Sequence, residues 1–161
     1  MRALLRRIWG RAEPALSVAG PRDAAALAAL HAASFNRGWS EHEFEQLLTA
    51  RNVVADRAAN GRATVGFILS RRAADEAEIL SVAVARSWRG RGLARRLLDL
   101  HLRRLAGYGL RAVFLEVDES NKPARRLYAR AGFGEVGRRP AYYGHSAGQP
   151  TNALVLRRNL S

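Results

Sequence analysis

Two glycines, Gly90 and Gly92, stand among arginines directly after an apolar run and directly before a leucine-rich one. A bend that opens a helix exposes backbone N–H groups without partners, and the helix dipole adds partial positive charge there. Glycine lets the backbone approach a ligand closely, and four arginines between residues 86 and 95 raise the local positive potential. This combination predicts a pyrophosphate site, with a plain structural turn as the alternative.

Two familiar nucleotide-binding patterns do not fit this bend. The dinucleotide pattern GxGxxG needs a third glycine, but residue 95 is arginine. The P-loop needs a lysine followed by serine or threonine, and the bend has neither. A pyrophosphate held here would therefore belong to neither class.

The elements around the bend follow from hydrophobic periodicity and turn residues. Leucines from Leu93 to Leu105 recur at helical spacing, Asn60-Gly61 separates two apolar runs, and Ser40 with Glu43 forms a capping box. The predicted helices are 21–34, 40–48, 93–105 and 121–131, and the predicted strands are 52–55, 64–70, 78–84, 112–117, 135–139 and 153–157. This order indicates a single α/β or α+β domain.

Length and composition limit the class of protein. The 161 residues predict one domain, expected at residues 15–161 after a basic arm at residues 1–14. No apolar stretch approaches the roughly 18 residues of a membrane span. The chain has no cysteine, which excludes disulfides, thiolate metal sites and cysteine nucleophiles. The N-terminus lacks the apolar region of a secretory signal, so we expect a cytoplasmic protein.

The charge is strongly basic. Lys and Arg number 27 against 14 Asp and Glu, a formal net charge of +13, and Lys122 is the only lysine. Such an excess predicts attraction to polyanions, for example RNA, the ribosome surface or a polyphosphate cofactor. Arginine and alanine enrichment also follows from a GC-rich genome, so the charge suggests a class of partner and names none.

The bend resembles motif A of the GNAT acetyltransferases, [Q/R]-x-x-G-x-[G/A]. Arg89, Gly92 and Ala94 occupy its three fixed positions, between a predicted strand and a predicted helix. The resemblance implies a mixed, mostly antiparallel sheet of about six to seven strands flanked by about four helices. It also implies splayed central strands that hold acetyl-CoA, without a metal.

Further matches extend from about Trp39 to Leu156. The series Leu115-Glu-Val, Asn121, Leu127-Tyr and Gly132-Phe is similar to the GNAT branch that acetylates protein N-termini, most of all to the RimI type. This resemblance implies acetyl transfer to the N-terminal alanine of ribosomal protein bS18, by direct attack in a ternary complex.

The resemblance assigns acetyl-CoA contacts to the strand before the bend, to the bend itself and to the asparagine that precedes the next helix. These residues are Val82, Ala83, Val84, Arg89, Gly90, Arg91, Gly92, Leu93, Ala94, Arg95 and Asn121. In the family the strand pairs with the pantetheine arm and the backbone of the bend holds the pyrophosphate. Asn121 could equally cap the helix that begins at Lys122.

The resemblance also implies that Glu116 is the general base and Tyr128 the general acid. A protein α-amine, with a pKa of about 7.7–8.0, must lose a proton before it attacks a thioester, and a carboxylate suits that step. A phenol with a pKa near 10 can protonate the leaving thiolate. The alternatives are a strand-end Glu116 paired with an arginine and a core Tyr128 with a satisfied hydroxyl.

Fewer residues are predicted to bind the acceptor peptide than to bind acetyl-CoA. Trp39, Tyr142 and Tyr143 match positions that flank the substrate peptide in RimI-like enzymes, although Trp39 could instead be a hydrophobic plug. Where those enzymes tend to carry an acidic residue before the last strand, this chain has Thr151-Asn152. That departure weakens the assignment of a basic bS18 N-terminus, and it leaves Asp118 and Glu119 as the nearby acids.

Other functions stay open at this point. The acceptor could be a lysine side chain or a small amine such as a polyamine or an aminoglycoside, and the chain could be a basic RNA- or ribosome-binding module without catalysis. The four histidines show no metal-ligand spacing, and Ser81 and Ser120 lack a histidine–aspartate pair for a hydrolase triad. We expect a monomer or a weak dimer.

Overall fold

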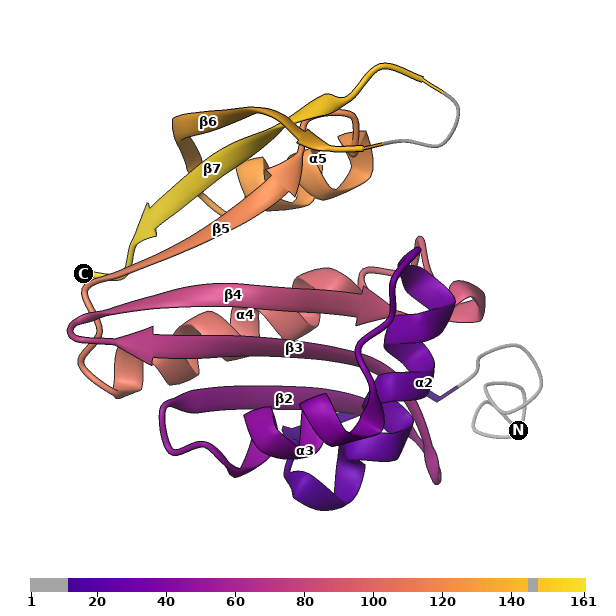
Figure 1. Ribbon diagram of the computed structural model, residues 1–161. Helices are drawn as coiled ribbons and strands as arrows, with labels where there is room; N and C mark the ends of the chain where they lie inside the picture. Colours follow the sequence, from indigo (N-terminus) through magenta and orange to yellow (C-terminus); the bar gives the residue numbers. More distant parts are fainter. Residues whose placement is uncertain (1–11, 145–147) are drawn as a thin grey trace, which may run out of the picture.

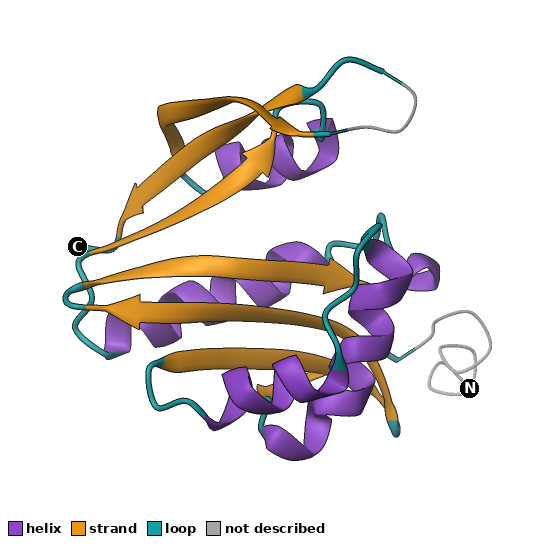
Figure 2. Cartoon of the chain, in the orientation of Figure 1, coloured by secondary structure: helices purple, strands orange, loops and turns teal. Residues whose placement is uncertain are grey.

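The computed structural model describes residues 12–144 and 148–161, which form a seven-stranded sheet with helices on both faces (Figures 1 and 2). The strands are β1 (Ala15–Val18), β2 (Val53–Asn60), β3 (Ala63–Ala73), β4 (Glu76–Val84), β5 (Ala112–Asp118), β6 (Gly134–Tyr143) and β7 (Thr151–Asn159). The helices are α2 (Ala24–Ser34), α3 (Glu41–Thr49), α4 (Leu93–Gly107) and α5 (Lys122–Arg130). Residues 1–11, most of the predicted basic arm, lie outside the described residues.

The strands lie in the order β1-β2-β3-β4-β5-β7-β6, and of the neighbouring pairs only β4 and β5 are parallel. The predicted mixed, mostly antiparallel sheet is therefore confirmed, and each predicted helix and strand is present in the predicted order. The sequence pattern does not reveal β1, because its four residues are mostly exposed and too few to show an alternation.

β2 is longer than predicted. The apolar pattern ends at Ala55, whereas the strand continues to Asn60. The reason is that the two polar residues in its middle have partners: Asp56 is fully buried in a hydrogen-bonded cluster, and Arg57 donates to Thr64 Oγ1 on β3. Paired polar side chains are thus part of the strand, although aspartate is more typical of a turn.

The cluster around Asp56 joins β2, β3 and α4. His101 Nδ1 lies 2.8 Å from Asp56 Oδ2, and His101 Nε2 lies 2.6 Å from Ser70 Oγ. Arg104 Nε donates to Asp56 Oδ1 at 2.9 Å. Because a carboxylate oxygen in an ion pair accepts hydrogen bonds, His101 donates from Nδ1 to Asp56, and its Nε2 is the nitrogen that contacts the Ser70 hydroxyl. The order of groups is that of a hydrolase triad, but Asp56, Ser70 and His101 are fully buried, so the cluster is structural.

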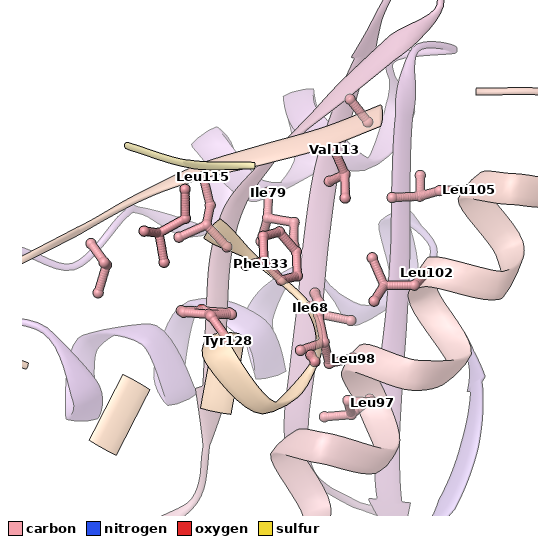
Figure 3. Close-up of a cluster of buried hydrophobic side chains, with 14 of the residues drawn as sticks. Ile68, Ile79, Leu97, Leu98, Leu102, Leu105, Val113, Leu115, Tyr128 and Phe133 are labelled. Atoms are coloured by element: carbon pink, nitrogen blue, oxygen red, sulfur yellow. The ribbon is translucent and has the colours of Figure 1, made fainter. Parts of the chain in front are cut away.

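Two apolar clusters lie on opposite faces of the sheet. Successive strand residues point to opposite faces, so Ile68 of β3 packs under α4 and α5 while Phe67 packs under α2 and α3. Figure 3 shows the first cluster, in which Leu97, Leu98, Leu102 and Leu105 of α4 pack near Ile68, with Tyr128 and Phe133 from the segment around α5. We call these two sides the α4/α5 face and the α2/α3 face.

The sheet opens between β4 and β5. The two strands pair only from Glu76↔Ala112 to Glu78↔Phe114, and beyond these three pairs they separate, as Figure 1 shows. A bulge at Leu80, where Leu69 pairs with Ser81 and Ser70 with Ile79, bends β4 at the start of this separation. The gap therefore has an unpaired strand edge on each side.

Candidate active site between β4 and β5

The separation of β4 and β5 forms a cleft of about 690 Å³. Its walls come from both strands, from the loop after α2, from α5 and from the end of β6. The lining residues include Glu116, Asn121, Tyr128 and Tyr143. The structure thus brings together residues that are far apart in sequence and that the sequence assigned to catalysis and binding.

The glycine-rich bend lies at the open end of β4. Gly90 and Gly92 have φ values of +73° and +78°, which favour glycine, and a Cβ at either position would meet no atom within 4 Å. Within the described residues, the backbone N–H groups of residues 90 to 95 have no hydrogen-bond acceptor. The predicted row of free donors at the start of α4 is therefore present, with open space in front of its glycines.

The arginines of the bend are not equivalent. Arg89 Nε donates to the carbonyl of Val84 at 3.0 Å and so ties the bend to the end of β4. Arg91 stacks over Trp88 with its guanidinium carbon 5.3 Å from the ring centroid, and Arg95 pairs with Asp99 at 2.9 Å. The Nε–H of Arg89 is thus used inside the protein, whereas the backbone N–H groups of the bend are free for an anion.

The backbone groups of Val82, Ala83 and Val84, the positions on β4 predicted to contact acetyl-CoA, do not all face the gap. Ala85 N donates to Val65 O at 2.8 Å, and antiparallel partners alternate between bonded and non-bonded pairs. Ala83 therefore directs its backbone groups toward β3, whereas Val82 and Val84 direct theirs into the gap. Arg89 already binds the Val84 carbonyl, so the free donors of this edge are the N–H groups of Val82 and Val84.

Glu116 lies on β5 two residues beyond the last pair with β4. Leu115 and Val117 belong to the apolar cluster of the α4/α5 face, so Glu116 projects from the α2/α3 face. Its Oε1 forms an ion pair with Arg139, with the Arg139 Nε atom 2.9 Å away, which realises the predicted alternative of an arginine pair. The Glu116 side chain is 18% exposed and Arg139 is 59% exposed, so solvent weakens this ion pair.

Tyr128 reaches the cleft from α5 on the other face. It packs edge-on against Phe133 at a centroid distance of 5.6 Å and is 8% exposed. Burial, with a smaller contribution from Tyr143, raises the pKa of Tyr128 to about 12. Its hydroxyl has no hydrogen-bond partner among the described residues, so the predicted alternative of a satisfied core tyrosine does not hold.

Asn121 and the predicted acceptor-side aromatics have separate positions. Asn121 Oδ1 caps α5 by accepting from Ala124 N at 3.2 Å, and the residue also lines the cleft. Tyr143 lines the cleft, and burial together with the Glu116 carboxylate raises its pKa. Tyr142 is 52% exposed and packs edge-to-face against Tyr143 without lining the cleft.

Trp39 is not brought to the cleft. Its ring stacks on His31 at a centroid distance of 4.5 Å, and its backbone N–H donates to His31 Nδ1 at 3.0 Å. Burial lowers the pKa of His31, which keeps the ring neutral and able to accept this bond. Trp39 lines a second cavity, of about 590 Å³, between α3 and the sheet. The alternative of a hydrophobic plug describes its position best.

The cleft residues that sequence reasoning missed include four at the end of α2 and in the loop after it, and a serine on β4. They are Ser34, Phe35, Asn36, Arg37 and Ser81. The Asn-Arg-Gly signal at residues 36–38 predicts only the end of a helix, and the end of α2 is what the structure shows. A loop that follows a helix and precedes a capping box gives no sign of which strand it covers.

The acidic residues near Thr151-Asn152 accept hydrogen bonds from other residues of the protein. Asp118 Oδ1 accepts hydrogen bonds from Ser120 and from Thr151 Oγ1, and Glu119 accepts from both the backbone and the side chain of Asn152. Glu119 also lies 3.5 Å from Arg138. These acids therefore brace the end of β5 against β7.

Among the described residues, no group of three or more His, Asp or Glu side chains is arranged to hold a metal ion. No helix in residues 12–144 or 148–161 has the length and apolar character needed to cross a bilayer.

A model of the acetyltransferase (GNAT) family matches residues 24–133. The [ribosomal protein bS18]-alanine N-acetyltransferase of Haemophilus influenzae is 36% identical over 92 residues, which are 57% of this chain and 62% of that protein. The chain thus spans about three fifths of that relative's length. The Escherichia coli K12 protein of the same name is 32% identical over 118 residues, 73% of this chain and 78% of that one.

Solved structures agree with this fold. The crystal structure of the ribosomal-protein-S18-alanine N-acetyltransferase from Escherichia coli has a TM-score of 0.85 at 25% identity, covering 92% of this chain and 94% of that chain. Arabidopsis thaliana NAA60 in complex with acetyl-CoA has a TM-score of 0.79 at 20% identity, covering 91% and 98%. At that identity the second likeness supports the fold alone.

Proposed function

The chain belongs to the acetyltransferase (GNAT) family, and on that premise we propose that it transfers the acetyl group of acetyl-CoA to the N-terminal α-amine of a protein. The observation that carries this proposal is the row of free N–H groups at residues 90 to 95, placed at the mouth of a gap with Glu116 on one face and Tyr128 on the other. Ribosomal protein bS18 is the first candidate acceptor, because the curated relatives act on it by name.

The residues present fit acetyl-CoA. The N–H groups of the bend suit a pyrophosphate, and the N–H groups of Val82 and Val84 offer the edge of a strand to an extended amide-bearing arm. Asn121 uses only Oδ1 for its helix cap, so its Nδ2 can donate to the same arm. When bound, acetyl-CoA supplies the acetyl group as a thioester.

The two faces of the gap support direct transfer in a ternary complex. The acceptor amine enters from the α2/α3 face, where Glu116 projects, and Tyr128 lies on the α4/α5 face near the leaving sulfur. Glu116 takes a proton from the amine, directly or through water, as the new C–N bond forms and the C–S bond breaks. The closest contact of Arg139 with Glu116 is at Oε1, so we assign this proton to Oε2.

Tyr128 acts chiefly as a hydrogen-bond donor. With a pKa of about 12, the hydroxyl stays protonated at any physiological pH. It is then a weaker acid than a thiol, whose pKa is about 8.5, so complete proton transfer to the thiolate is unfavourable. A donated hydrogen bond stabilises the charge that develops on sulfur as it leaves.

Mass spectrometry tests the acceptor. The protein is incubated with acetyl-CoA and an alanine-initiated bS18 peptide, or with spermidine or an aminoglycoside. We expect one acetyl group on the peptide α-amine. A peptide rate at background, with rapid acetylation of a small amine, would replace this acceptor by the second candidate. Calorimetry with acetyl-CoA separates both from a purely RNA- or ribosome-binding role in the cytoplasm, which predicts no binding.

Substitution of Gly92 by valine tests the phosphate cradle. A β-branched residue is strained at a φ of +78° and moves the free N–H groups, so we expect the Kd for acetyl-CoA to rise at least about tenfold. The matched control is Gly61→Val in the β2–β3 turn, where φ is +61° and no atom lies within 4 Å of the added Cβ. Calorimetry on both variants decides: an equal Kd for the two would remove the cradle role.

Tyr128→Phe removes the hydroxyl and keeps the ring that packs on Phe133. We expect kcat to fall about 10- to 100-fold while the Kd for acetyl-CoA changes little, because the lost hydrogen bond is strongest as the thiolate leaves. Steady-state kinetics and calorimetry on the same preparation measure the two quantities. Unchanged kcat would show that the hydroxyl has no part in the reaction.

A further inference from the structure

Ser81 holds a buried hydroxyl that nothing in the protein satisfies. The residue is 7% exposed, and its Oγ has no hydrogen-bond partner among the described residues. Leaving a buried polar atom without a partner costs free energy, and native proteins rarely do so without a reason. Ser81 lines the cleft between β4 and β5, so a ligand in that cleft is the available partner.

The position of Ser81 relative to Glu116 follows from the strand register. The last parallel pair is Glu78↔Phe114, and Glu116 lies two residues further along β5. Without the bulge, the β4 residue opposite Glu116 would be Leu80, two residues beyond Glu78. Because the bulge adds one residue to β4, Leu80 and Ser81 both lie opposite Glu116 across the gap. The bulge therefore places a hydroxyl level with the carboxylate.

Both side chains project from the same face. Ala83, two residues beyond Ser81, packs in the cluster of the α2/α3 face, and residues two apart on a strand share a face. Glu116 also projects from the α2/α3 face, because its neighbours Leu115 and Val117 pack on the other side. Ser81 and Glu116 thus flank the gap from the side on which the acceptor arrives.

From this arrangement we propose that Ser81 Oγ accepts a hydrogen bond from the acceptor α-amine and, with Glu116, fixes the direction of its lone pair. The inference rests on the proposed function. The neutral amine that attacks carries two N–H donors and one lone pair, so two acceptors, one for each N–H, leave the lone pair facing the thioester. Oε2 of Glu116 provides one of them, since Arg139 engages Oε1, and Ser81 provides a second from the opposite strand.

Two buried serines give a matched test. Ser81→Ala removes an unsatisfied hydroxyl, so thermal stability should be equal to or higher than that of the wild type. At the same time kcat/KM for the alanine-initiated bS18 peptide should fall about 10- to 100-fold, with an unchanged KM for acetyl-CoA. Ser70→Ala instead removes the hydroxyl that binds His101, so stability should fall while kcat/KM stays within about twofold, measured below its melting temperature.

The possible outcomes distinguish failure of the proposed function from failure of the role proposed for Ser81. A wild-type protein that does not acetylate the peptide overturns the proposed function, and with it this inference. An active wild type with an equally active Ser81→Ala variant overturns this inference alone. A Ser81→Ala variant that loses stability as Ser70→Ala does would show that Ser81 is structural, and would also overturn it.

Discussion

Replacing Glu116 by glutamine is expected to lower kcat/KM for the acceptor peptide by about 10²- to 10⁴-fold, the usual contribution of a positioned general base. Glutamine keeps the shape of the side chain but cannot take the proton of the amine. The variant should still bind acetyl-CoA, because the cradle at residues 90 to 95 is built from backbone N–H groups on another segment. Steady-state kinetics with the peptide and calorimetry with acetyl-CoA measure the two effects.

The pH profile gives this substitution a second readout. Without an internal base, the rate of the Glu116→Gln variant should depend on the fraction of acceptor that is already deprotonated. It should therefore rise as the pH passes the pKa of the α-amine, about 7.7–8.0, and the deficit relative to the wild type should shrink. A deficit that stays constant across this range would argue against a proton-accepting role.

Glu135→Gln is the matched control for the lost ion pair. Glu135 Oε1 accepts from Arg138 Nε at 2.8 Å, close to the 2.9 Å of the Glu116–Arg139 pair, and Glu135 does not line the cleft. If the loss at Glu116 came only from breaking an arginine pair, both variants would lose activity alike. We expect Glu135→Gln to stay within about twofold of the wild type.

The largest effect on stability is expected at Asp56. Asp56→Asn leaves Arg104 and His101 without the carboxylate that both contact, and breaking a buried ion pair typically lowers the free energy of unfolding by about 3–5 kcal/mol. A domain of this size has about 5–15 kcal/mol in total, so the variant should unfold at markedly lower urea concentration. Urea titration followed by circular dichroism measures the change.

An exposed aspartate serves as the comparison for Asp56. Asp75 pairs with Arg111 at 3.2 Å, with side chains 53% and 76% exposed, and such pairs contribute at most about 1 kcal/mol. Asp75→Asn should therefore leave the unfolding midpoint nearly unchanged. A loss below about 1 kcal/mol at Asp56 as well would mean that the cluster of β2, β3 and α4 is not the anchor described above.

The features that the sequence predicted best are local motifs, which depend only on residues close together along the chain. The bend at residues 89–95 is a local motif, and its glycines, its helix start and its free N–H groups are all consequences of one short segment. The capping box of Ser40 and Glu43 is likewise local and forms as predicted. The apolar run of β3 and the periodic leucines of α4 also predict their elements correctly, because each pattern extends over many residues.

What the sequence could not predict depends on register between distant strands. The pair of Glu116 with Arg139 requires β6 to lie beside β7 and β7 beside β5. The contacts of Asp56 with His101 require α4 to cross β2 at one particular turn. Trp39 shows the same limit, since only the fold reveals that His31, eight residues earlier, lies beneath its ring.

The opening between β4 and β5 also has a consequence for the whole molecule. The strands from β1 to β4 and the group β5, β7 and β6 are joined within the sheet by only three residue pairs. A coenzyme arm that fills the gap would pair with the free strand edges and so link the two parts of the sheet. By mass action, a ligand at one hundred times its Kd adds about 2.7 kcal/mol to the folded state. The supply of acetyl donor would then set the enzyme's resistance to unfolding and proteolysis as well as its rate.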